Sequence, residues 1–216
     1  MGRRALPKLN PTVEFDSYLH IVKELEEGSS PETFFKTSRP IELEIGCGKG
    51  LFLAGVTGEK PEHNFLGIEV SAKYASYSAY QLARRERENG HILSGDALGY
   101  MRDHVLDHSL TAVHIYFPDP WWKDRHRKRR VLNEVSAKDI QRVLIPGGKL
   151  HFWTDVQEYY ESALEILAAS TTLSAPIDVV EKPAEHDLDY RTHFERRTRK
   201  NGEPVYRAQF VKETAA

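Results

Sequence analysis

The sequence of 216 residues has a single cysteine, Cys47, which excludes an internal disulfide and any zinc site built from several cysteines. Long apolar runs are also missing, because no stretch reaches the roughly 20 residues that a membrane-spanning helix needs. Residues 1–8 lack the apolar core of a secretory signal peptide. We therefore expect a cytoplasmic protein with no membrane partner.

The chain also has little net charge, formally −2, so its average field does not attract a polyanion, and only local basic patches can do so. Its ten histidines show no metal-ligand spacing, and we expect them on the surface with no metal bound. No repeat or low-complexity segment interrupts the sequence. A hydrophobic content of 40% with 29% charged residues is ordinary for a globular protein with one large core.

Short apolar runs alternate with helical stretches after residue 40, which is typical of a Rossmann-like, doubly wound and mostly parallel α/β sheet with helices on both faces. The pattern predicts strands over residues 41–45, 65–70, 91–94, 112–117 and 149–154, and helices from residue 51 and over 72–87, 136–144 and 156–169. Runs near 177–180 and 205–211 predict two further strands, with an antiparallel edge. Residues 12–27 predict one amphipathic helix that ends at Gly28. We expect an N-terminal extension over residues 1–40 and a single domain over 41–216.

A glycine loop, Gly46-Cys47-Gly48-Lys49-Gly50, follows the first predicted strand, and its small residues let a ligand approach the backbone. A dinucleotide-binding loop would have a further glycine at Leu51, so a nicotinamide-dependent oxidoreductase is the weakest alternative. Glu44 lies two residues before the loop and would repel a pyrophosphate. This negative strand end instead suits S-adenosylmethionine, which carries an ammonium and a sulfonium centre. No partner base is evident for Cys47, which we interpret as a packing residue.

Four more acidic residues follow the predicted strands in the same way. Glu69 ends the second strand, where a carboxylate can accept both ribose hydroxyls of a nucleoside. Asp96 follows the third strand and is placed to accept the exocyclic amine of adenine, while Asp119 and Asp155 follow the fourth and fifth. One such residue is most often a helix cap or a solvated carboxylate. Five at successive strand ends predict a binding crevice, because the carboxyl ends of parallel strands converge.

Residues 114–130 read His-Ile-Tyr-Phe-Pro-Asp-Pro-Trp-Trp-Lys-Asp-Arg-His-Arg-Lys-Arg-Arg. Pro118 and Pro120 fix φ and favour extended conformations at Phe117 and Asp119, so the carboxylate of Asp119 lies on a stiff turn. The tryptophans that follow offer a flat face to a base, and the basic run offers contacts to phosphates. A charge run alone is most often a solvated surface. A carboxylate, aromatic rings and a polycation in this order indicate a nucleic-acid substrate.

These residues resemble a known family. The loop 44–50, Glu69, Asp96 and the turn 146–150 resemble class I S-adenosylmethionine-dependent methyltransferases. The segment 117–121 with the basic run, Thr154-Asp155 and residues 192–195 is similar to the bacterial tRNA (guanine-N7-)-methyltransferase family, over about residues 41–211. Two positions depart from the family pattern: Trp122 lies where proline or histidine is frequent, and His193 where lysine is common.

The resemblance implies a role for each matched residue. The implied cofactor-binding residues are Glu44, Gly46, Gly48, Gly50, Glu69, Asp96 and Asp119, and Asp119 is also the implied catalytic residue. The implied substrate-binding residues are Lys123, Asp155, Thr192, His193, Phe194 and Glu195. The implied RNA-binding residues are Arg125, His126, Arg127, Lys128, Arg129 and Arg130.

The family resemblance implies methyl transfer from S-adenosyl-L-methionine to N7 of a guanosine in the tRNA variable loop, guanosine 46. Because N7 has an in-plane lone pair and no proton, we interpret Asp119 as a group that orients the reactants and not as a general base. Asp155 and Glu195 would help to stabilise the positive charge that develops on the guanine.

Two other functions stay open. A small-molecule class I methyltransferase would share the cofactor loop but would leave the basic run unexplained. A catalytically silent RNA-binding protein would keep the basic run without needing five carboxylates. The sequence does not distinguish a monomer from a homodimer.

Overall fold

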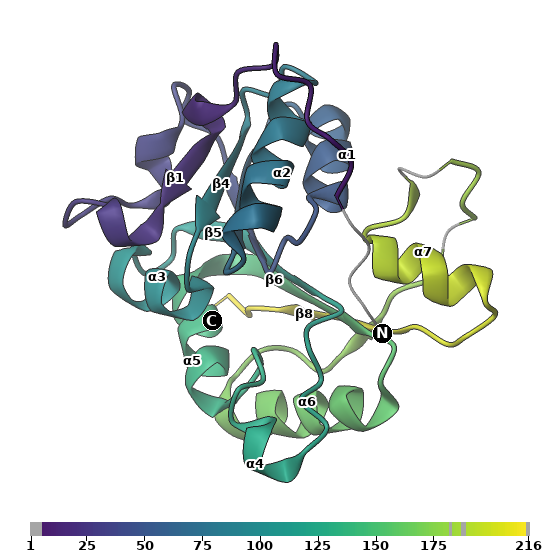
Figure 1. Cartoon of the computed structure of the whole chain (residues 1–216). Helices are drawn as coiled ribbons and strands as arrows, with labels where there is room; N and C mark the ends of the chain where they lie inside the picture. Colours follow the sequence, from purple (N-terminus) through teal and green to yellow (C-terminus); the bar gives the residue numbers. More distant parts are fainter. Residues whose placement is uncertain (1–5, 182, 187–188, 215–216) are drawn as a thin grey trace.

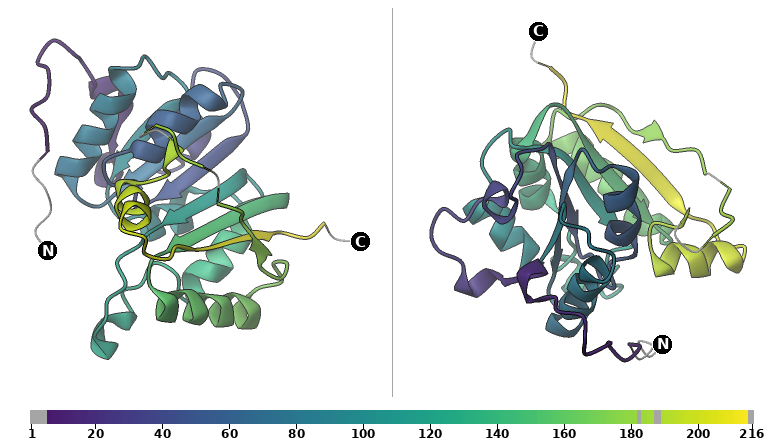
Figure 2. Two further views of the ribbon diagram at one scale, coloured as in Figure 1. Left: turned by 90° about the vertical axis from the view of Figure 1, so that its right-hand side faces the viewer. Right: turned by 90° about the horizontal axis from the view of Figure 1, so that it is seen from above.

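The structure, a computed structural model, describes residues 6–181, 183–186 and 189–214. In this part of the chain eight strands form one sheet in the order β1-β4-β3-β2-β5-β6-β8-β7. Neighbours from β1 to β6 are parallel, whereas β8 is antiparallel to β6 and β7 is antiparallel to β8. Helices lie on both faces (Figure 1 and Figure 2). The predicted doubly wound, mostly parallel sheet with an antiparallel edge is confirmed.

The strands are β1 (Leu19–Ile21), β2 (Ile41–Ile45), β3 (Asn64–Glu69), β4 (Gly90–Ser94), β5 (Leu110–Tyr116), β6 (Leu144–Thr154), β7 (Ile177–Asp178) and β8 (Tyr206–Val211). The α-helices are α1 (Leu51–Glu59), α2 (Ala72–Ala83), α3 (Ala97–His104), α4 (Asp124–Arg127), α5 (Glu134–Val143), α6 (Gln157–Ser170) and α7 (His193–Lys200). The chain runs outward from β2 through β3 to β4 and then crosses back to β5 on the other side of β2. The reversal point lies between β2 and β5, where sheets of this kind bind ligands.

The hydrophobic core has two layers because successive side chains of a strand point to opposite faces. Leu43, Ile115 and Phe152 belong to the layer that packs against α3, α5 and α6. Phe65 and Ile92 belong to the layer that packs against α1 and α2. The central strands are therefore covered on both faces, which explains why they are nearly continuous apolar runs.

The prediction of one amphipathic helix over residues 12–27 is wrong. This stretch forms two 3₁₀ turns, η1 (Asp16–Tyr18) and η2 (Val22–Glu24), on either side of β1. Strand β1 pairs in parallel with the edge of β4, and the ring of Tyr18 stacks on His91 at 5.9 Å. Pairing with an open sheet edge outweighs helical periodicity here, because the edge offers hydrogen bonds and an apolar surface together.

The boundaries of later elements differ by a few residues from the predictions. Helix α5 begins earlier than expected because Asn133 caps it: Asn133 Oδ1 accepts hydrogen bonds from Val135 N and Ser136 N at 3.0 and 3.1 Å. Strand β6 begins at Leu144 instead of residue 149, with Gly147 at φ 80°. Helix α2 ends at Ala83, four residues before the predicted end. Helices α3, α4 and α7 were not among the predicted elements.

Candidate active site

The glycine loop (46–50) joins β2 to α1 and is fastened to the neighbouring strand, because Gly46 N donates to Ile68 O at 2.8 Å. Its three glycines have positive φ values, a conformation that other residues rarely adopt. A Cβ at Gly50 would lie 2.7 Å from Ser78 Oγ, whereas a Cβ at Gly46 would have no described atom within 4 Å. Packing against α2 therefore requires Gly50, and the loop leaves open space beside Gly46 for a ligand.

Glu44 and Glu69 bring two carboxylates to this loop. Glu69 Oε2 accepts a hydrogen bond from Gly48 N at 3.0 Å, and Glu69 Oε1 accepts one from Ser71 N at 2.9 Å. Glu44 is 2% exposed, and its Oε2 has no hydrogen-bond partner among the described residues. Burial and then the Glu69 carboxylate raise the pKa of Glu44 to about 8, and Arg191 opposes this shift. A buried carboxyl group with an unpaired oxygen fits a cationic ligand group at this strand end.

Cys47 is buried within the loop. Burial, with smaller contributions from the Glu44 and Glu69 carboxylates, raises the pKa of its thiol well above the ordinary value. The thiol is thus kept protonated, which agrees with its interpretation as a packing residue and disfavours a nucleophile.

The topology brings the other three acidic residues to the same edge of the sheet. Asp96 follows β4, Asp119 lies in the turn after β5, and Asp155 follows β6. Asp96 also caps α3, since its Oδ1 accepts a hydrogen bond from Leu98 N at 3.1 Å. Asp119 is exposed, and Asp155 is half-buried. All five carboxylates therefore lie at or just after the carboxyl ends of parallel strands that are neighbours in the sheet.

Asp119 lies at the centre of a turn that has a left-handed residue at each end. The angle φ is 50° at Phe117 and 45° at Trp121. The prediction of an extended Phe117 is wrong. Phe117 N still donates to Trp153 O at 2.8 Å, so the chain must leave the sheet immediately after this last strand contact. Such conformations cost about 1–3 kcal/mol each, so surrounding contacts must hold the turn in place.

The basic segment, defined here as residues 125–130, begins within α4 and carries several exposed cations. Arg125, Lys128 and Arg129 are exposed, as is the preceding Lys123. The Arg129 guanidinium lies 5.2 Å from the ring centre of Trp121, so the segment is packed against the Asp119 turn. His126 also faces this ring, at 5.9 Å between ring centres.

Arg130 differs from the rest of the basic segment because it is only 3% exposed. Its Nε donates to Pro120 O at 2.8 Å, and its two terminal nitrogens donate to the two carboxylate oxygens of Glu158 at 3.2 and 2.6 Å. Arg127 forms an ion pair with the same carboxylate at 3.4 Å. The implied RNA-binding role does not match this position, since the Arg130 guanidinium is directed into the protein.

The start of α7 carries the residues matched to substrate binding. Thr192 Oγ1 caps the helix by accepting a hydrogen bond from Glu195 N at 3.0 Å. Glu195 is 1% exposed, and its Oε1 accepts hydrogen bonds from Arg199 and Arg207 at 3.3 and 3.2 Å. Its Oε2 accepts one from Arg191 N at 2.6 Å. Glu195 therefore braces the start of the helix, and its charge is already balanced by arginines.

Arg191 connects this helix start to the helix that follows the glycine loop. Its guanidinium lies 5.4 Å from the ring centre of Phe52, in the first turn of α1, directly after the glycine loop. In Figure 1, α7 lies to one side of the sheet, near α1. The exposed side chains at the start of α7 are His193 and Phe194.

His114 is a buried polar residue that sequence reasoning misplaced on the surface. It is 3% exposed, its Nε2 lies 2.7 Å from Glu42 Oε2, and its Nδ1 lies 2.9 Å from Tyr116 OH. Its place in the apolar run Leu110–Tyr116 was the available signal, because a residue there is buried whatever its type. This pair lies on the α1 face of the sheet, below the strand ends that carry the carboxylates.

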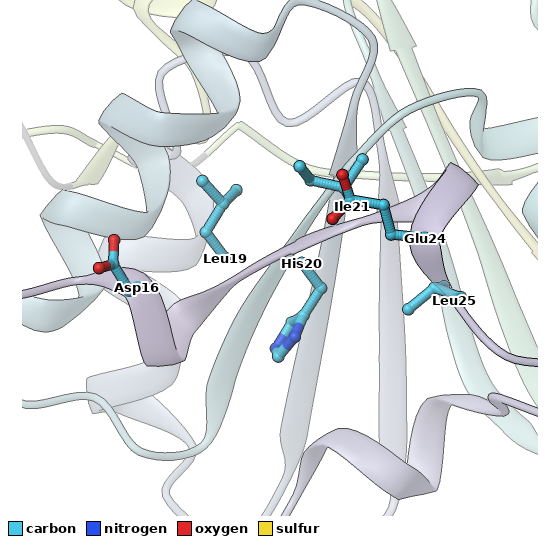
Figure 3. A pocket seen from close by; sticks show the side chains of 6 residues that line it. All are labelled: Asp16, Leu19, His20, Ile21, Glu24 and Leu25. Carbon is cyan, nitrogen blue, oxygen red and sulfur yellow. The ribbon is translucent and has the colours of Figure 1, made fainter.

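A separate surface hollow of about 390 Å³ lies beside β1 and contains none of the five strand-end carboxylates. It is lined by Asp16, Leu19, His20, Ile21, Glu24 and Leu25, and Leu19 and His20 project to opposite sides of the strand (Figure 3). Among the described residues, no cluster of histidine, cysteine or acidic side chains is arranged to hold a metal ion. No helix in the described ranges has the length and apolar character to cross a membrane.

The chain is similar to known methyltransferases over most of its length. Residues 38–208 match a protein family described as "Putative methyltransferase". The tRNA (guanine-N(7)-)-methyltransferase of Rhodopirellula baltica is 46% identical over 98% of this chain and 80% of the relative. The enzyme of the same name from Cupriavidus necator is 38% identical over 85% of this chain and 70% of the relative.

A solved structure supports the fold alone. A mutant of the 16S rRNA (adenine(1408)-N(1))-methyltransferase from Catenulisporales acidiphilia, with cosubstrate SAM, is 17% identical and superposes with a TM-score of 0.55. The match covers 82% of this chain and 87% of that chain. From the family match and the two sequence relatives together, the chain belongs to the tRNA (guanine-N7-)-methyltransferase family.

Proposed function

We propose that this protein transfers a methyl group from S-adenosyl-L-methionine to N7 of a guanosine in tRNA, at guanosine 46 of the variable loop. The observation that carries the proposal is the position of Asp119. It stands on the turn that joins the row of strand-end carboxylates to the basic segment. A cofactor crevice and a surface for a polyanion therefore meet at one exposed carboxylate.

The residues at the crevice fit this cofactor. The unpaired, buried Oε2 of Glu44 is a site for the ammonium group of the methionine moiety. Glu69 uses both oxygens to hold the glycine loop and the start of α2, and a carboxylate oxygen can accept a further hydrogen bond, here from a ribose hydroxyl. Asp96 is placed for the adenine amine, and the open space beside Gly46 admits the ligand. When bound, S-adenosylmethionine would supply the methyl group of its sulfonium centre. The electron pair of the broken carbon–sulfur bond would stay on sulfur.

The chain's own residues orient the guanine. N7 needs no deprotonation, so Asp119 acts by accepting hydrogen bonds from the N1 and N2 protons of guanine or by holding the cofactor ammonium, which aligns the reacting atoms. Asp155 and Asp119 lie after neighbouring strands and favour the positive charge that appears on the methylated ring. His193 and Phe194, exposed beside the crevice, and the capping hydroxyl of Thr192 complete the substrate side, with Glu195 as their brace.

RNA is held by the exposed members of the basic segment together with Lys123. Phosphate contacts from Arg125, Arg127, Lys128 and Arg129 would supply affinity without sequence information, so the shape of the tRNA must contribute to target choice. His126 lies within the same surface against Trp121.

The experiment incubates the protein with unmodified tRNA and methyl-labelled S-adenosylmethionine, followed by chemical cleavage at N7-methylguanosine. We expect label in the tRNA and a cleavage product that ends at position 46. Label at another nucleotide would show that the protein methylates a different position and would overturn guanosine 46 as the target. Cofactor binding without binding or labelling of tRNA would support the small-molecule alternative, and tRNA binding without any transfer would support a silent RNA-binding protein.

A further inference from the structure

All three nitrogen atoms of the Arg130 guanidinium donate hydrogen bonds inside the protein. Nε donates to the backbone carbonyl of Pro120, and Nη1 and Nη2 donate to the two oxygens of Glu158. The Cζ atom of the group lies 4.5 Å from the ring centre of Tyr159, which is fully buried. The side chain of Arg130 is 4% exposed, compared with 44% for its partner Glu158. A phosphate cannot reach this group without displacing these contacts.

The contacts join two elements at the carboxyl ends of β5 and β6. Glu158 and Tyr159 lie in the first turn of α6, which begins two residues after Asp155, and Pro120 is the residue after Asp119. One planar side chain thus connects the turn that carries the exposed carboxylate to the helix that follows β6. Arginine suits this position because its donors form a rigid fork, which matches a carboxylate and leaves Nε for a carbonyl.

The turn needs such a support. Phe117 and Trp121 both have left-handed φ values, an unfavourable conformation for aromatic residues, and together they bracket Pro118, Asp119 and Pro120. The hydrogen bond from Phe117 N to Trp153 O fixes the beginning of the turn. The hydrogen bond from Arg130 to Pro120 O fixes its end. Without the second contact, the turn would lose its connection to α6 and keep only the strand contact at its beginning.

We propose that Arg130 is a positioning residue for the methyl transfer, which holds the Asp119 turn against α6 and makes no contact with RNA. The inference rests on the proposed function of the Asp119 crevice and separates one member of the basic segment from the rest. Arg130 acts through the backbone carbonyl of Pro120, whereas the exposed cations act on phosphates.

The first test is Arg130→Lys, which keeps the positive charge but loses the fork. Lysine keeps the positive charge that a phosphate contact needs, but it cannot bind Pro120 O and both Glu158 oxygens together. We expect the single-turnover rate of tRNA methylation to fall by about ten- to hundredfold, the scale of a small misplacement of a reacting group. The dependence of tRNA affinity on salt concentration should match that of the wild type.

Glu158→Gln is the second variant, and it is expected to fold because it keeps the shape of a side chain that is 44% exposed. It weakens the contact between Arg130 and Glu158 without changing a basic residue. The single-turnover rate should therefore fall, as it does in Arg130→Lys. Combined with Arg130→Lys, the loss should be smaller than the product of the two separate losses, because both remove one interaction. Glu161→Gln is the matched control, since Glu161 is an exposed carboxylate on the same helix, and it should keep the wild-type rate.

The salt dependence does not require catalysis and therefore separates the two proposals. An inactive wild-type protein would refute the proposed function, and the slope would still report whether Arg130 touches RNA. A slope flattened by about 0.7 in a folded Arg130→Ala would show a lost phosphate contact and overturn the inference. A wild-type methylation rate in both Arg130→Lys and Glu158→Gln would overturn it as well.

Discussion

Asp119 is the residue at which the local sequence and the tertiary contacts act together. The prolines on both sides restrict the turn, but the left-handed angle at Phe117 and the anchors at Trp153 and Arg130 set the direction of the carboxylate. The exposed position of Asp119 leaves it accessible to a substrate, in contrast to the buried Glu44. The proposed function gives the two carboxylates different environments: Asp119 is open to a substrate, whereas Glu44 is enclosed at the glycine loop.

We expect Asp119→Asn to lower the rate of methyl transfer by about 100-fold or more, because the change keeps the shape of the side chain and removes a charge that favours the cationic product. Affinity for tRNA should be nearly unchanged. Single-turnover rates at saturating cofactor and tRNA measure the first quantity, and filter binding measures the second. Rates close to wild type would mean that Asp119 only stabilises the turn.

Glu44 should make the stability of the ligand-free protein depend on pH. Its pKa is about 8 in the folded protein and 4.5 as an ordinary carboxyl group, so between these values the folded state keeps a proton that the unfolded state has released. The free energy of unfolding therefore falls as pH rises through this window, by at most about 1.4 kcal/mol per pH unit from this one group. Urea unfolding from pH 5 to 8 measures the slope.

Two comparisons isolate Glu44 from the other titrating groups. Glu44→Gln should remove its share of the slope, because glutamine does not ionise. A bound ammonium group favours the carboxylate, so cofactor affinity should rise with pH up to about 8 in the wild type and not in the variant. Identical slopes for the two proteins would exclude a protonated Glu44 in the folded state.

At the scale of elements, the basic segment combines two functions that the sequence does not separate. Arg130 faces α6, Arg127 pairs with Glu158, and Arg129 lies over the Trp121 ring, while Arg125 and Lys128 are exposed on and directly after α4. Side chains of one type thus support the turn or face solvent, depending on their direction from a short helix.

We expect Arg125→Ala with Lys128→Ala to flatten the slope of log tRNA affinity against log salt concentration by up to about 1.4, at roughly 0.7 for each contact to a single-strand phosphate. Lys36→Ala is the matched control, because the Lys36 side chain is 86% exposed and precedes β2, at the amino end of the sheet. Its slope should equal that of the wild type. An unchanged slope in the double variant would show that these two residues do not contact phosphates and belong to an ordinary solvated surface.

At the scale of the whole molecule, the N-terminal residues pack against the sheet more extensively than the predicted extension suggests. β1 adds a strand to the outer edge of β4, Asn10 N donates to Tyr80 OH at 3.2 Å, and Val22 and Phe34 pack against the core. The division at residue 40 stays a prediction, but these contacts favour a single folding unit.

Deletion of residues 1–28 should therefore lower the melting temperature, because it exposes the edge of β4 and apolar surface on both sides of the sheet. A loss of 1 kcal/mol corresponds to about 2–4 °C for a chain of this size. Deletion of residues 1–8, which ends before Asn10, is the control and should change the melting temperature far less. Equal melting temperatures for the two truncated proteins would support an independent extension.

The sheet, the glycine loop and the row of acidic residues could be predicted from the sequence, because these depend on local periodicity and on the rule that parallel strands end at one edge. The basic run after Asp119 is equally visible there. The sequence could not show that residues 12–27 form a strand between 3₁₀ turns, that His114 is buried against Glu42, or that Arg130 contacts the Asp119 turn. Each of these depends on a partner far away in the chain: the edge of β4, the neighbouring strand β2 and the first turn of α6. The local pattern of residue types predicts the secondary structure. The burial and direction of a side chain depend on which parts of the chain the fold places beside it.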